Sequence, residues 1–150
     1  MNSLKRTDSD DADFLKLVVL LDQDLKIRDG EDHAFYNQFN KTDTIKHAIV
    51  YYENGVAVAC GAFREKTNDT VEIKRMYVHF EHRKKGIASI ILKELETWAA
   101  EVQYKYTILE TGKNQPEAIA LYQKQKYTIT PNYPPYEEMD NSVCMKKTLY

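Results

Sequence analysis

The sequence is poor in cysteine and has no long apolar run, and these two absences exclude several classes of protein. Only two of the 150 residues are cysteines, Cys60 and Cys144, and they lie far apart without CxxC spacing. We therefore expect free thiols in a reducing compartment rather than a disulfide. No stretch approaches the roughly 20 apolar residues that span a bilayer, and the N-terminal residues lack the apolar region of a signal peptide. Together these features predict a cytoplasmic protein without membrane association.

The charge balance and the uniform composition narrow the possibilities further. The formal net charge is −2, which gives no electrostatic reason to expect a nucleic-acid partner. The sequence has no internal repeat, linker or low-complexity segment, and its 43% hydrophobic and 29% charged residues are typical of a globular protein. We expect one domain over residues 1–150, as a monomer or a homodimer. His33, His47 and His82 lack metal-ligand spacing, so no metal site is predicted.

Hydrophobic periodicity predicts alternating strands and helices. Period-two alternation and β-branched residues predict strands at 3–7, 45–52, 56–63, 71–78, 104–110, 127–130 and 142–149. Apolar residues at helical spacing predict helices up to about residue 28, at 31–39, at 87–100 and from Pro116 onward. Asn54-Gly55 is the favoured type I′ turn and joins the second and third strands as a hairpin.

The order of these elements, (β)-α-α-β-β-β-α-β-α-β-β, predicts an α/β fold. The strand–helix–strand unit over 71–110 requires a right-handed crossover and a parallel strand pair, whereas the hairpins before it are antiparallel. We therefore expect a mixed sheet of six to seven strands flanked by about four helices. In such a sheet a ligand binds at the carboxyl ends of the central strands.

A basic turn joins the strand at 71–78 to the helix at 87–100. It contains Arg83-Lys84-Lys85-Gly86, and the helix follows directly. The first turn of a helix has unpaired N–H groups and the positive end of the helix dipole, which together attract phosphate. Gly86 lets the backbone approach a ligand closely, and Ala88 keeps the next turn free of bulk. The stretch therefore predicts an anion site.

This turn resembles a motif of the GNAT superfamily of N-acetyltransferases. Arg83-x-x-Gly86-x-Ala88, after a strand that ends in Met76-Tyr77-Val78, fits the family's acetyl-CoA motif Q/R-x-x-G-x-G/A. The resemblance implies that acetyl-CoA is the co-substrate. The cofactor-binding residues that it implies are Met76, Tyr77 and Val78 for the pantetheine and thioester, and Arg83, Lys84, Lys85, Gly86, Ile87, Ala88 and Ser89 for the pyrophosphate. For Lys84 and Lys85 a solvated basic patch remains the alternative.

A second segment resembles the later GNAT motif N-x-x-A-x-x-L-Y-x-x-x-G-F. Its matching residues are Asn114, Ala118, Leu121 and Tyr122. The segment has one extra residue between Asn114 and Ala118, and Lys126-Tyr127 stands where Gly-Phe is usual. A non-glycine residue is therefore expected in a strained conformation at the end of this helix. The resemblance implies that Asn114 binds the pantetheine arm and that the chain covers the whole family domain.

The reaction that the resemblance implies is transfer of acetyl from acetyl-CoA to a primary amine of a small molecule by direct attack. A protein or peptide N-acetyltransferase and a non-catalytic acyl-CoA sensor remain alternatives. The acidic residues within 1–32 would border the acceptor groove, where they either favour a cationic acceptor or form only a solvated face. The loop Tyr133-Pro134-Pro135-Tyr136 is either a lid over the acceptor or a rigid connection.

The chemistry requires a base, because an alkylammonium with a pKa of about 10.4 costs about 4–5 kcal/mol to deprotonate at pH 7. Glu72 matches the catalytic glutamate of the family's histone-acetylating branch. By the period of two it shares a face with Lys74, Met76 and Val78, but about 13 Å of strand separates it from Met76, which favours a water relay. The alternative is that Glu72 only pairs with Lys74 or Arg75. His79 and Glu110 are the fallback bases.

The leaving thiolate of CoA requires a proton. The family's general acid is a tyrosine in the Leu-Tyr position, which is Tyr122 in this chain. A tyrosine packed in the core is the alternative for this residue.

Overall fold

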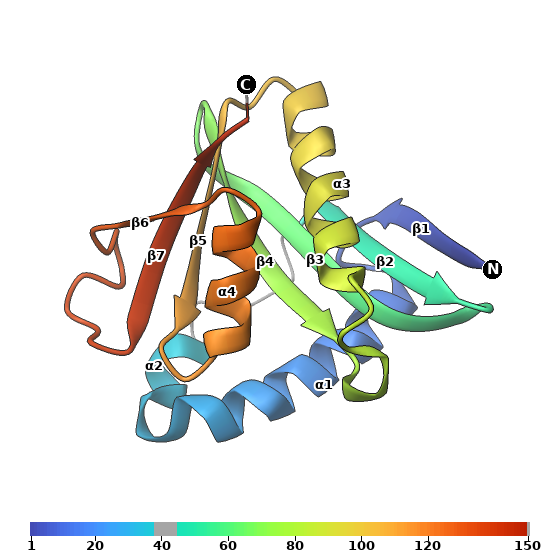
Figure 1. The fold of residues 1–150 in the computed structure, drawn as a ribbon, viewed down its shortest axis with the longest axis horizontal. Helices are drawn as coiled ribbons and strands as arrows, with labels where there is room; N and C mark the ends of the chain where they lie inside the picture. The colour runs from blue at the N-terminus through green and yellow to red at the C-terminus, as the bar shows by residue number, and fades with distance from the viewer. Residues whose placement is uncertain (38–44, 150) are drawn as a thin grey trace.

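The computed structural model describes residues 1–37 and 45–149 and contains one seven-stranded mixed sheet (Figure 1). The strands are β1 (Asn2–Thr7), β2 (His47–Glu53), β3 (Val56–Thr67), β4 (Thr70–Val78), β5 (Tyr106–Gly112), β6 (Thr128–Thr130) and β7 (Ser142–Thr148). The helices are α1 (Ala12–Asp29), α2 (His33–Asn37), α3 (Ile87–Glu101) and α4 (Pro116–Lys124), with short 3-10 turns at Gly30–Asp32 and Phe80–His82. The order of strands in the sheet is β1-β2-β3-β4-β5-β7-β6.

The sheet has a hydrophobic core on each face. On one face Ile91, Leu92 and Leu95 of α3 are fully buried, in a cluster that also includes Tyr122 of α4. On the other face α1 contributes Phe14, Leu17, Val18 and Leu21 to a second cluster. The helices therefore cover the sheet from both sides, and α1 and the starts of α3 and α4 lie around the ends of β4 and β5 (Figure 1).

The predicted order of elements and the mixed sheet are confirmed. The β2–β3 hairpin turns at Asn54 and Gly55, whose φ angles of 52° and 82° are those of a type I′ turn. Only three helices reach nine residues in the described part of the chain, because the second predicted helix, at 31–39, is reduced to the five residues of α2. Residues 38 and 39 of that prediction lie outside the described residues. Lys126 has the expected left-handed conformation, with a φ of 76°.

The central strands β4 and β5 are paired over only a short length. Their parallel register runs from Thr70 opposite Tyr106 to Glu72 opposite Ile108. Beyond this point the two strands diverge toward their carboxyl ends (Figure 1). The sheet thus opens at the place where a ligand is expected.

A β-bulge in β4 changes which side chains face this opening. Cys60 lies opposite Tyr77 and Ala62 opposite Lys74, so two residues of β4 oppose the single residue Gly61 of β3. Arg75 lies in the bulge with a φ of 59°. An extra residue reverses the alternation of side chains beyond it.

The bulge corrects one expectation. The prediction that Glu72 shares a face with Met76 and Val78 is wrong, because both of these pack against the core beneath α3. Lys74 instead lies opposite Ala62, which belongs to the core beneath α1. Glu72 and Lys74 therefore face the α1 side of the sheet.

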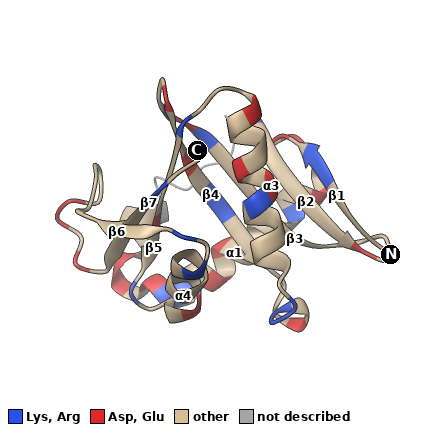
Figure 2. Ribbon diagram, turned by 45° about the horizontal axis from the view of Figure 1, so that its top comes forward, with Lys and Arg blue, Asp and Glu red and all other residues tan. Residues whose placement is uncertain are grey.

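Acidic and basic residues are interspersed over the helices and strands (Figure 2), in keeping with the net charge of −2. In the part of the chain that the structure describes, no helix combines the length and the apolar character needed to cross a membrane. Cys60 and Cys144 are both free and buried, as expected.

Gly61 should be irreplaceable for the stability of the fold. A Cβ atom at this position would lie 2.5 Å from Met76 Sδ, 2.8 Å from Ile91 Cγ2 and 3.0 Å from Leu95 Cδ1. We expect Gly61→Ala to lower the free energy of unfolding by about 1–3 kcal/mol, because a packed core does not accept an extra methyl group. Urea denaturation measures this effect.

The matched control is Gly112→Ala, whose added Cβ would have its nearest neighbour at 3.6 Å, an ordinary contact. This variant should unfold at a urea concentration equal to or slightly above that of the parent. Equal midpoints for the two variants would show that the bulge tolerates the methyl group.

Candidate active site

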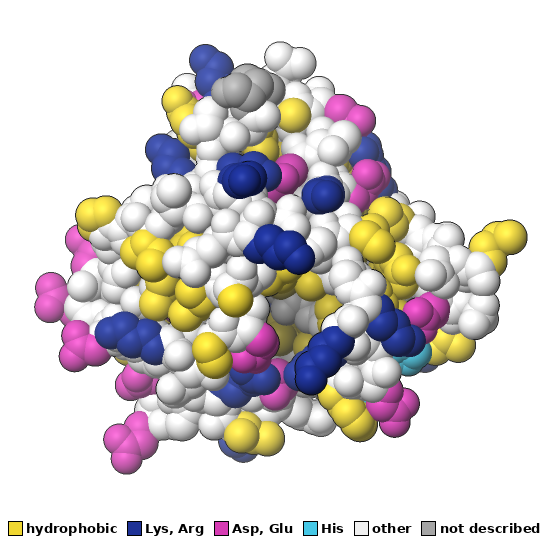
Figure 3. Space-filling view, in the orientation of Figure 1, with side chains coloured by type: hydrophobic (Ala, Val, Ile, Leu, Met, Phe, Trp, Pro, Cys, Tyr) yellow, Lys and Arg dark blue, Asp and Glu magenta, His cyan; other side chains and the backbone are white. Residues whose placement is uncertain are grey.

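A cavity of about 460 Å³ lies where β4 and β5 diverge. Its walls come from α1, the carboxyl halves of β4 and β5, the start of α3, and α4. Figure 3 shows the hollow from the side of α3 and α4, with hydrophobic side chains in its depth and charged side chains at its rim. The lining includes eleven of the thirteen predicted site residues: Glu72, Met76, Tyr77, Val78, Arg83, Lys84, Gly86, Ile87, Ala88, Ser89 and Tyr122.

The other two predicted residues, Lys85 and Asn114, are absent from this lining. Lys85 is exposed, and its Nζ lies 3.4 Å from a carboxylate oxygen of Glu53. Asn114 donates a hydrogen bond of 3.1 Å from Nδ2 to the carbonyl oxygen of Arg28, so it joins the loop before α4 to the end of α1. The N-cap of α4 is Gln115, not Asn114.

The turn before α3 has the geometry of an anion site. Gly86 is the N-cap of the helix in a left-handed conformation, with a φ of 80°, and no side chain caps the first turn. Because the first N–H groups of a helix have no partner within the helix, those of Ile87, Ala88 and Ser89 are available to a ligand. Lys84 is exposed beside them, also with a positive φ, of 66°.

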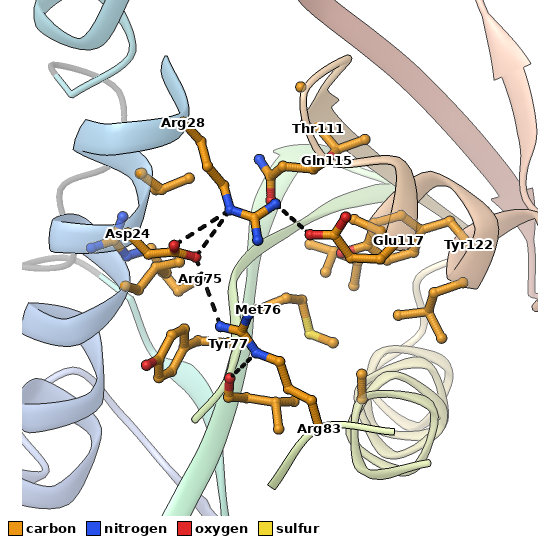
Figure 4. A pocket seen from close by; sticks show the side chains of 18 of the residues that line it. Asp24, Arg28, Arg75, Met76, Tyr77, Arg83, Thr111, Gln115, Glu117 and Tyr122 are labelled. Carbon is orange, nitrogen blue, oxygen red and sulfur yellow. Dashed lines mark hydrogen bonds and ion pairs between the residues drawn. The ribbon is translucent and has the colours of Figure 1, made fainter. Parts of the chain in front are cut away.

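Charged side chains form a bridge across the mouth of the cavity (Figure 4). Arg28 of α1 pairs with Glu117 of α4, and its Nε lies 3.3 Å from a carboxylate oxygen of Asp24. Arg83 donates from Nε to the carbonyl oxygen of Val78 at 2.8 Å, while its Nη2 lies 3.8 Å from Asp24. The bridge links α1 to α4 and to the turn at residues 83–86 before α3, which we call the anion turn. It narrows the opening of the cavity.

Glu72 is 1% exposed, and both of its carboxylate oxygens have partners. Oε1 lies 3.4 Å from the guanidinium of Arg64, and Oε2 accepts a hydrogen bond of 2.8 Å from the hydroxyl of Tyr133. The expected alternative partners, Lys74 and Arg75, are not bonded to it in the described structure. Arg64 lies opposite Glu72 on the neighbouring strand β3, so the hairpin pairing could have predicted this partner. Tyr133 is 61 residues away along the chain, and no local pattern in the sequence indicates its contact with Glu72.

Glu110 has the electrostatic properties that a general base needs. It lies on β5 opposite Cys144 and lines the cavity. Burial raises the pKa of its carboxyl to about 7, although a hydrogen bond from Ser142 and the charge of Lys74 act in the opposite direction. A group that changes its charge near neutral pH is suited to accept a proton there. From the sequence, Glu110 was only a second choice of base, because its environment depends on the tertiary fold.

Tyr122 lies on α4, is 6% exposed and faces the same cavity. Burial raises the pKa of its hydroxyl, and the negative charge of Glu110 raises it further. Its ring packs edge-on against Tyr127 with centroids 5.8 Å apart. Within residues 1–37 and 45–149 no hydrogen bond engages its hydroxyl, so this O–H group is available to a ligand.

The other fallback base, His79, lies in the 3-10 turn region before the anion site. His79, Glu81 and His82 offer ligand atoms within 4.8 Å of one another, a grouping that the sequence spacing did not predict. Two of these ring nitrogens already have partners. His79 Nδ1 accepts from the backbone N–H of Glu81 at 3.2 Å, and His82 Nδ1 lies 2.5 Å from Glu53.

Comparison with known proteins identifies relatives over most of the chain. The model of the acetyltransferase (GNAT) family matches residues 15–127. An IAA acetyltransferase of Azospirillum brasilense is 33% identical over 102 residues, which are 67% of each chain. The uncharacterized N-acetyltransferase YsnE of Bacillus subtilis is 31% identical over 100 residues, 65% of this chain and 66% of that protein.

Solved structures share the complete fold. A provisionally assigned acyl-CoA N-acyltransferase of Klebsiella pneumoniae superimposes with a TM-score of 0.82 and 28% identity, over 100% of this chain and 99% of that one. A provisionally assigned acetyltransferase of Salmonella typhimurium, solved with acetyl-CoA, has a TM-score of 0.71 and 18% identity, over 100% and 95% of the two chains. At the latter identity the likeness concerns the fold alone.

The raised pKa of Glu110 predicts a pH-dependent cost to stability. The carboxyl's ordinary pKa is 4.5, and its pKa of about 7 in the folded protein means that folding favours the protonated form. The folded protein thus has no electrostatic cost from Glu110 below pH 4.5, where the carboxyl is protonated. The cost of holding the charged carboxylate develops above pH 4.5 and is complete once the pH has risen through 7. Glu110→Gln has no such carboxyl, so it should be more stable than the parent at pH 8, by up to about 3 kcal/mol, and should lose this advantage by pH 4.5.

Urea unfolding of both proteins at several pH values between 4.5 and 8 measures the difference. Glu137→Gln, at an exposed position, controls for the loss of one negative charge. A constant difference between parent and Glu110→Gln over this range would contradict the raised pKa.

Proposed function

The chain belongs to the acetyltransferase (GNAT) family, and from this premise we propose that it transfers acetyl from acetyl-CoA to the primary amine of a small-molecule acceptor. The observation that carries the proposal is the continuous cavity, which connects an uncapped helix start to the partly buried carboxyl of Glu110 and the buried hydroxyl of Tyr122. The first feature suits a diphosphate, and the other two suit the two proton transfers of the reaction.

The cofactor would enter with its pyrophosphate at the first turn of α3. The N–H groups of Ile87, Ala88 and Ser89 would bind the phosphate oxygens, with Lys84 as an adjacent cation. The pantetheine would continue into the gap between β4 and β5, where the backbone beyond Glu72 is not paired across the gap. This placement brings the thioester next to Met76, beside the bulge.

Glu110 is the base that we favour over Glu72. The carboxylate of Glu72 is held by Arg64 and Tyr133, and a proton acceptor has to give up such bonds before it reacts. Glu110 has a pKa of about 7, so at neutral pH it is present in both charge states and can take a proton from an acceptor ammonium, directly or through water. In this assignment Glu72 positions the loop that carries Tyr133.

Tyr122 is the proposed general acid. Its raised pKa keeps the hydroxyl protonated at neutral pH, and the CoA thiolate that leaves the tetrahedral intermediate can accept this proton. The bridge of Arg28 and Glu117 narrows the mouth on the α1 side, which supports a small acceptor over a protein chain. The buried Tyr136, 2% exposed, supports a rigid connection for its loop.

Thiol release from acetyl-CoA across polyamines, amino acids, aminoglycosides and lysine peptides tests the proposed activity. We expect turnover with at least one small amine and little with the peptides. Micromolar binding of acetyl-CoA without turnover on any acceptor would favour a non-catalytic acyl-CoA sensor and contradict the proposal.

Replacement of Tyr122 by phenylalanine tests the acid. We expect kcat to fall about 100-fold, while the Kd for acetyl-CoA stays near that of the parent, because the substitution removes one hydroxyl and keeps the ring. Tyr106→Phe, on β5 outside the cavity lining, is the matched control and should keep parental turnover. If Tyr122→Phe is as active as the parent, Tyr122 is not the acid.

Replacement of Gly86 by glutamate tests the anion site. The glutamate adds a negative charge at the N–H groups that would bind the pyrophosphate, so calorimetry should detect no binding of acetyl-CoA. Gly86→Ala is the control, because it shares the strain of a side chain at a φ of 80° and adds no charge. Alanine should weaken binding far less than glutamate, and both variants should have similar circular dichroism spectra. Equal affinities for the two variants would place the phosphates elsewhere.

A further inference from the structure

Lys74 is a buried lysine that faces the proposed acceptor end of the cavity. It is 8% exposed and lines the cavity, on the face of β4 that also carries Glu72. Among the described residues no hydrogen bond or ion pair engages its Nζ. A buried lysine without a hydrogen-bond or ion-pair partner is unusual, since buried ammonium groups are nearly always paired.

The surroundings of Lys74 compensate its positive charge only in part. Burial lowers the pKa of its ammonium; the carboxylates of Glu72 and Glu110 act against this effect, and the guanidiniums of Arg64 and Arg75 add to it. Glu72 is bonded to Arg64 and so is not free to pair with Lys74. Burying a charge that lacks a partner is costly, and a ligand that supplies the missing anion recovers this cost on binding.

Three guanidiniums also line the cavity, and each lies within ion-pair distance of a carboxylate of α1. Arg75 donates from Nη2 to Asp22 at 2.6 Å, although its Nε and Nη1 are buried without a hydrogen-bond partner among the described residues, and Arg28 and Arg83 both lie within 4 Å of Asp24. These guanidiniums also lie toward α1 and the anion turn. Lys74 is thus a cation positioned to meet an anionic group of the acceptor, on the opposite side of the bulge from the proposed phosphate site.

Lys74 and Glu110 flank the opening between the strands. The parallel register places Thr70 opposite Tyr106 and Glu72 opposite Ile108, and continuing it would place Lys74 opposite Glu110. Because the pairing stops at Glu72, these two side chains line the gap from its two sides. One is a cation and the other a proton acceptor.

From this juxtaposition we propose that the acceptor is a zwitterion of the amino-acid type, with a carboxylate next to its amine, and that Lys74 binds this carboxylate. The ammonium of the acceptor then lies toward Glu110, which takes its proton before the amine attacks the thioester. This inference rests on the acetyl transfer proposed above and specifies its substrate class. A diamine or polyamine would bring a second cation toward Lys74 and should be disfavoured.

Matched acceptors test the proposal. Methionine, phenylalanine and glutamine are each compared with the corresponding α-amide and with the decarboxylated amine, by thiol release, in the parent and in Lys74→Met. The amines of a set differ in basicity, so the informative quantity is how the ratio of kcat/KM between acid and amide changes from parent to variant. We expect Lys74→Met to lower kcat/KM for the acids about 30- to 100-fold, mainly through KM, and to change kcat/KM for the amides less than about threefold.

Two further variants separate charge recognition from structural damage. Lys74→Arg keeps a cation and should retain most of the preference for acids, and Lys93→Met, at an exposed position on α3, should behave as the parent. If Lys74→Met lowers kcat/KM equally for acids and amides, the role of Lys74 is structural and the inference is wrong. Turnover of amines but of no acid by the parent also overturns it and leaves the proposed acetyl transfer intact. Absence of thiol release with every acceptor contradicts the acetyl transfer itself.

Discussion

The bulge at Arg75 is the constraint on which the rest of the site depends. One extra residue in β4, opposite a glycine in β3, reverses the direction of the side chains partway along the strand. Met76 and Val78 therefore pack beneath α3, whereas Glu72 and Lys74 face the opposite side of the sheet. In the proposed assignment the same strand would serve two sites, one for the cofactor and one for the acceptor, which the gap between β4 and β5 would connect.

The charges of the cavity follow this division. The anion turn presents backbone N–H groups and Lys84, and the side chains nearest it, Arg83 and Arg28, are held by Asp24 and Glu117. Pairing of this kind positions the guanidiniums and offsets their charge before a ligand arrives. At the other end the carboxyl of Glu110 and the ammonium of Lys74 have pKa values that burial shifts toward neutrality. Both are thereby adapted to respond to the charge of a bound molecule.

Local sequence signals predicted the order of elements, because each depends on neighbouring residues. Asn54-Gly55 specifies its turn, the basic turn and Gly86 mark a helix start, and Lys126 stands where the family motif has glycine. The bulge has no local signal in the sequence, because a non-glycine residue, Arg75, adopts its positive φ. The glycine that permits the bulge, Gly61, lies on the partner strand. The partnership of Glu72 with Tyr133 and the burial of Glu110 arise only when distant segments pack together. The position of the basic turn at the start of α3 could therefore be predicted from the sequence, whereas the contacts of Glu72 and the environment of Glu110 could not.

The electrostatic interaction between Glu110 and Tyr122 favours one order of the two proposed proton transfers, with Glu110 accepting its proton before Tyr122 donates. The negative charge of Glu110 raises the pKa of the Tyr122 hydroxyl, so the tyrosine holds its proton most tightly while the base is empty. When Glu110 accepts the proton of the acceptor ammonium, its charge disappears, and with it this part of the increase in the pKa of Tyr122. The hydroxyl then becomes a stronger acid at the stage when the thiolate leaves. Two titratable groups that share one cavity can in this way couple the removal of one proton to the delivery of the other.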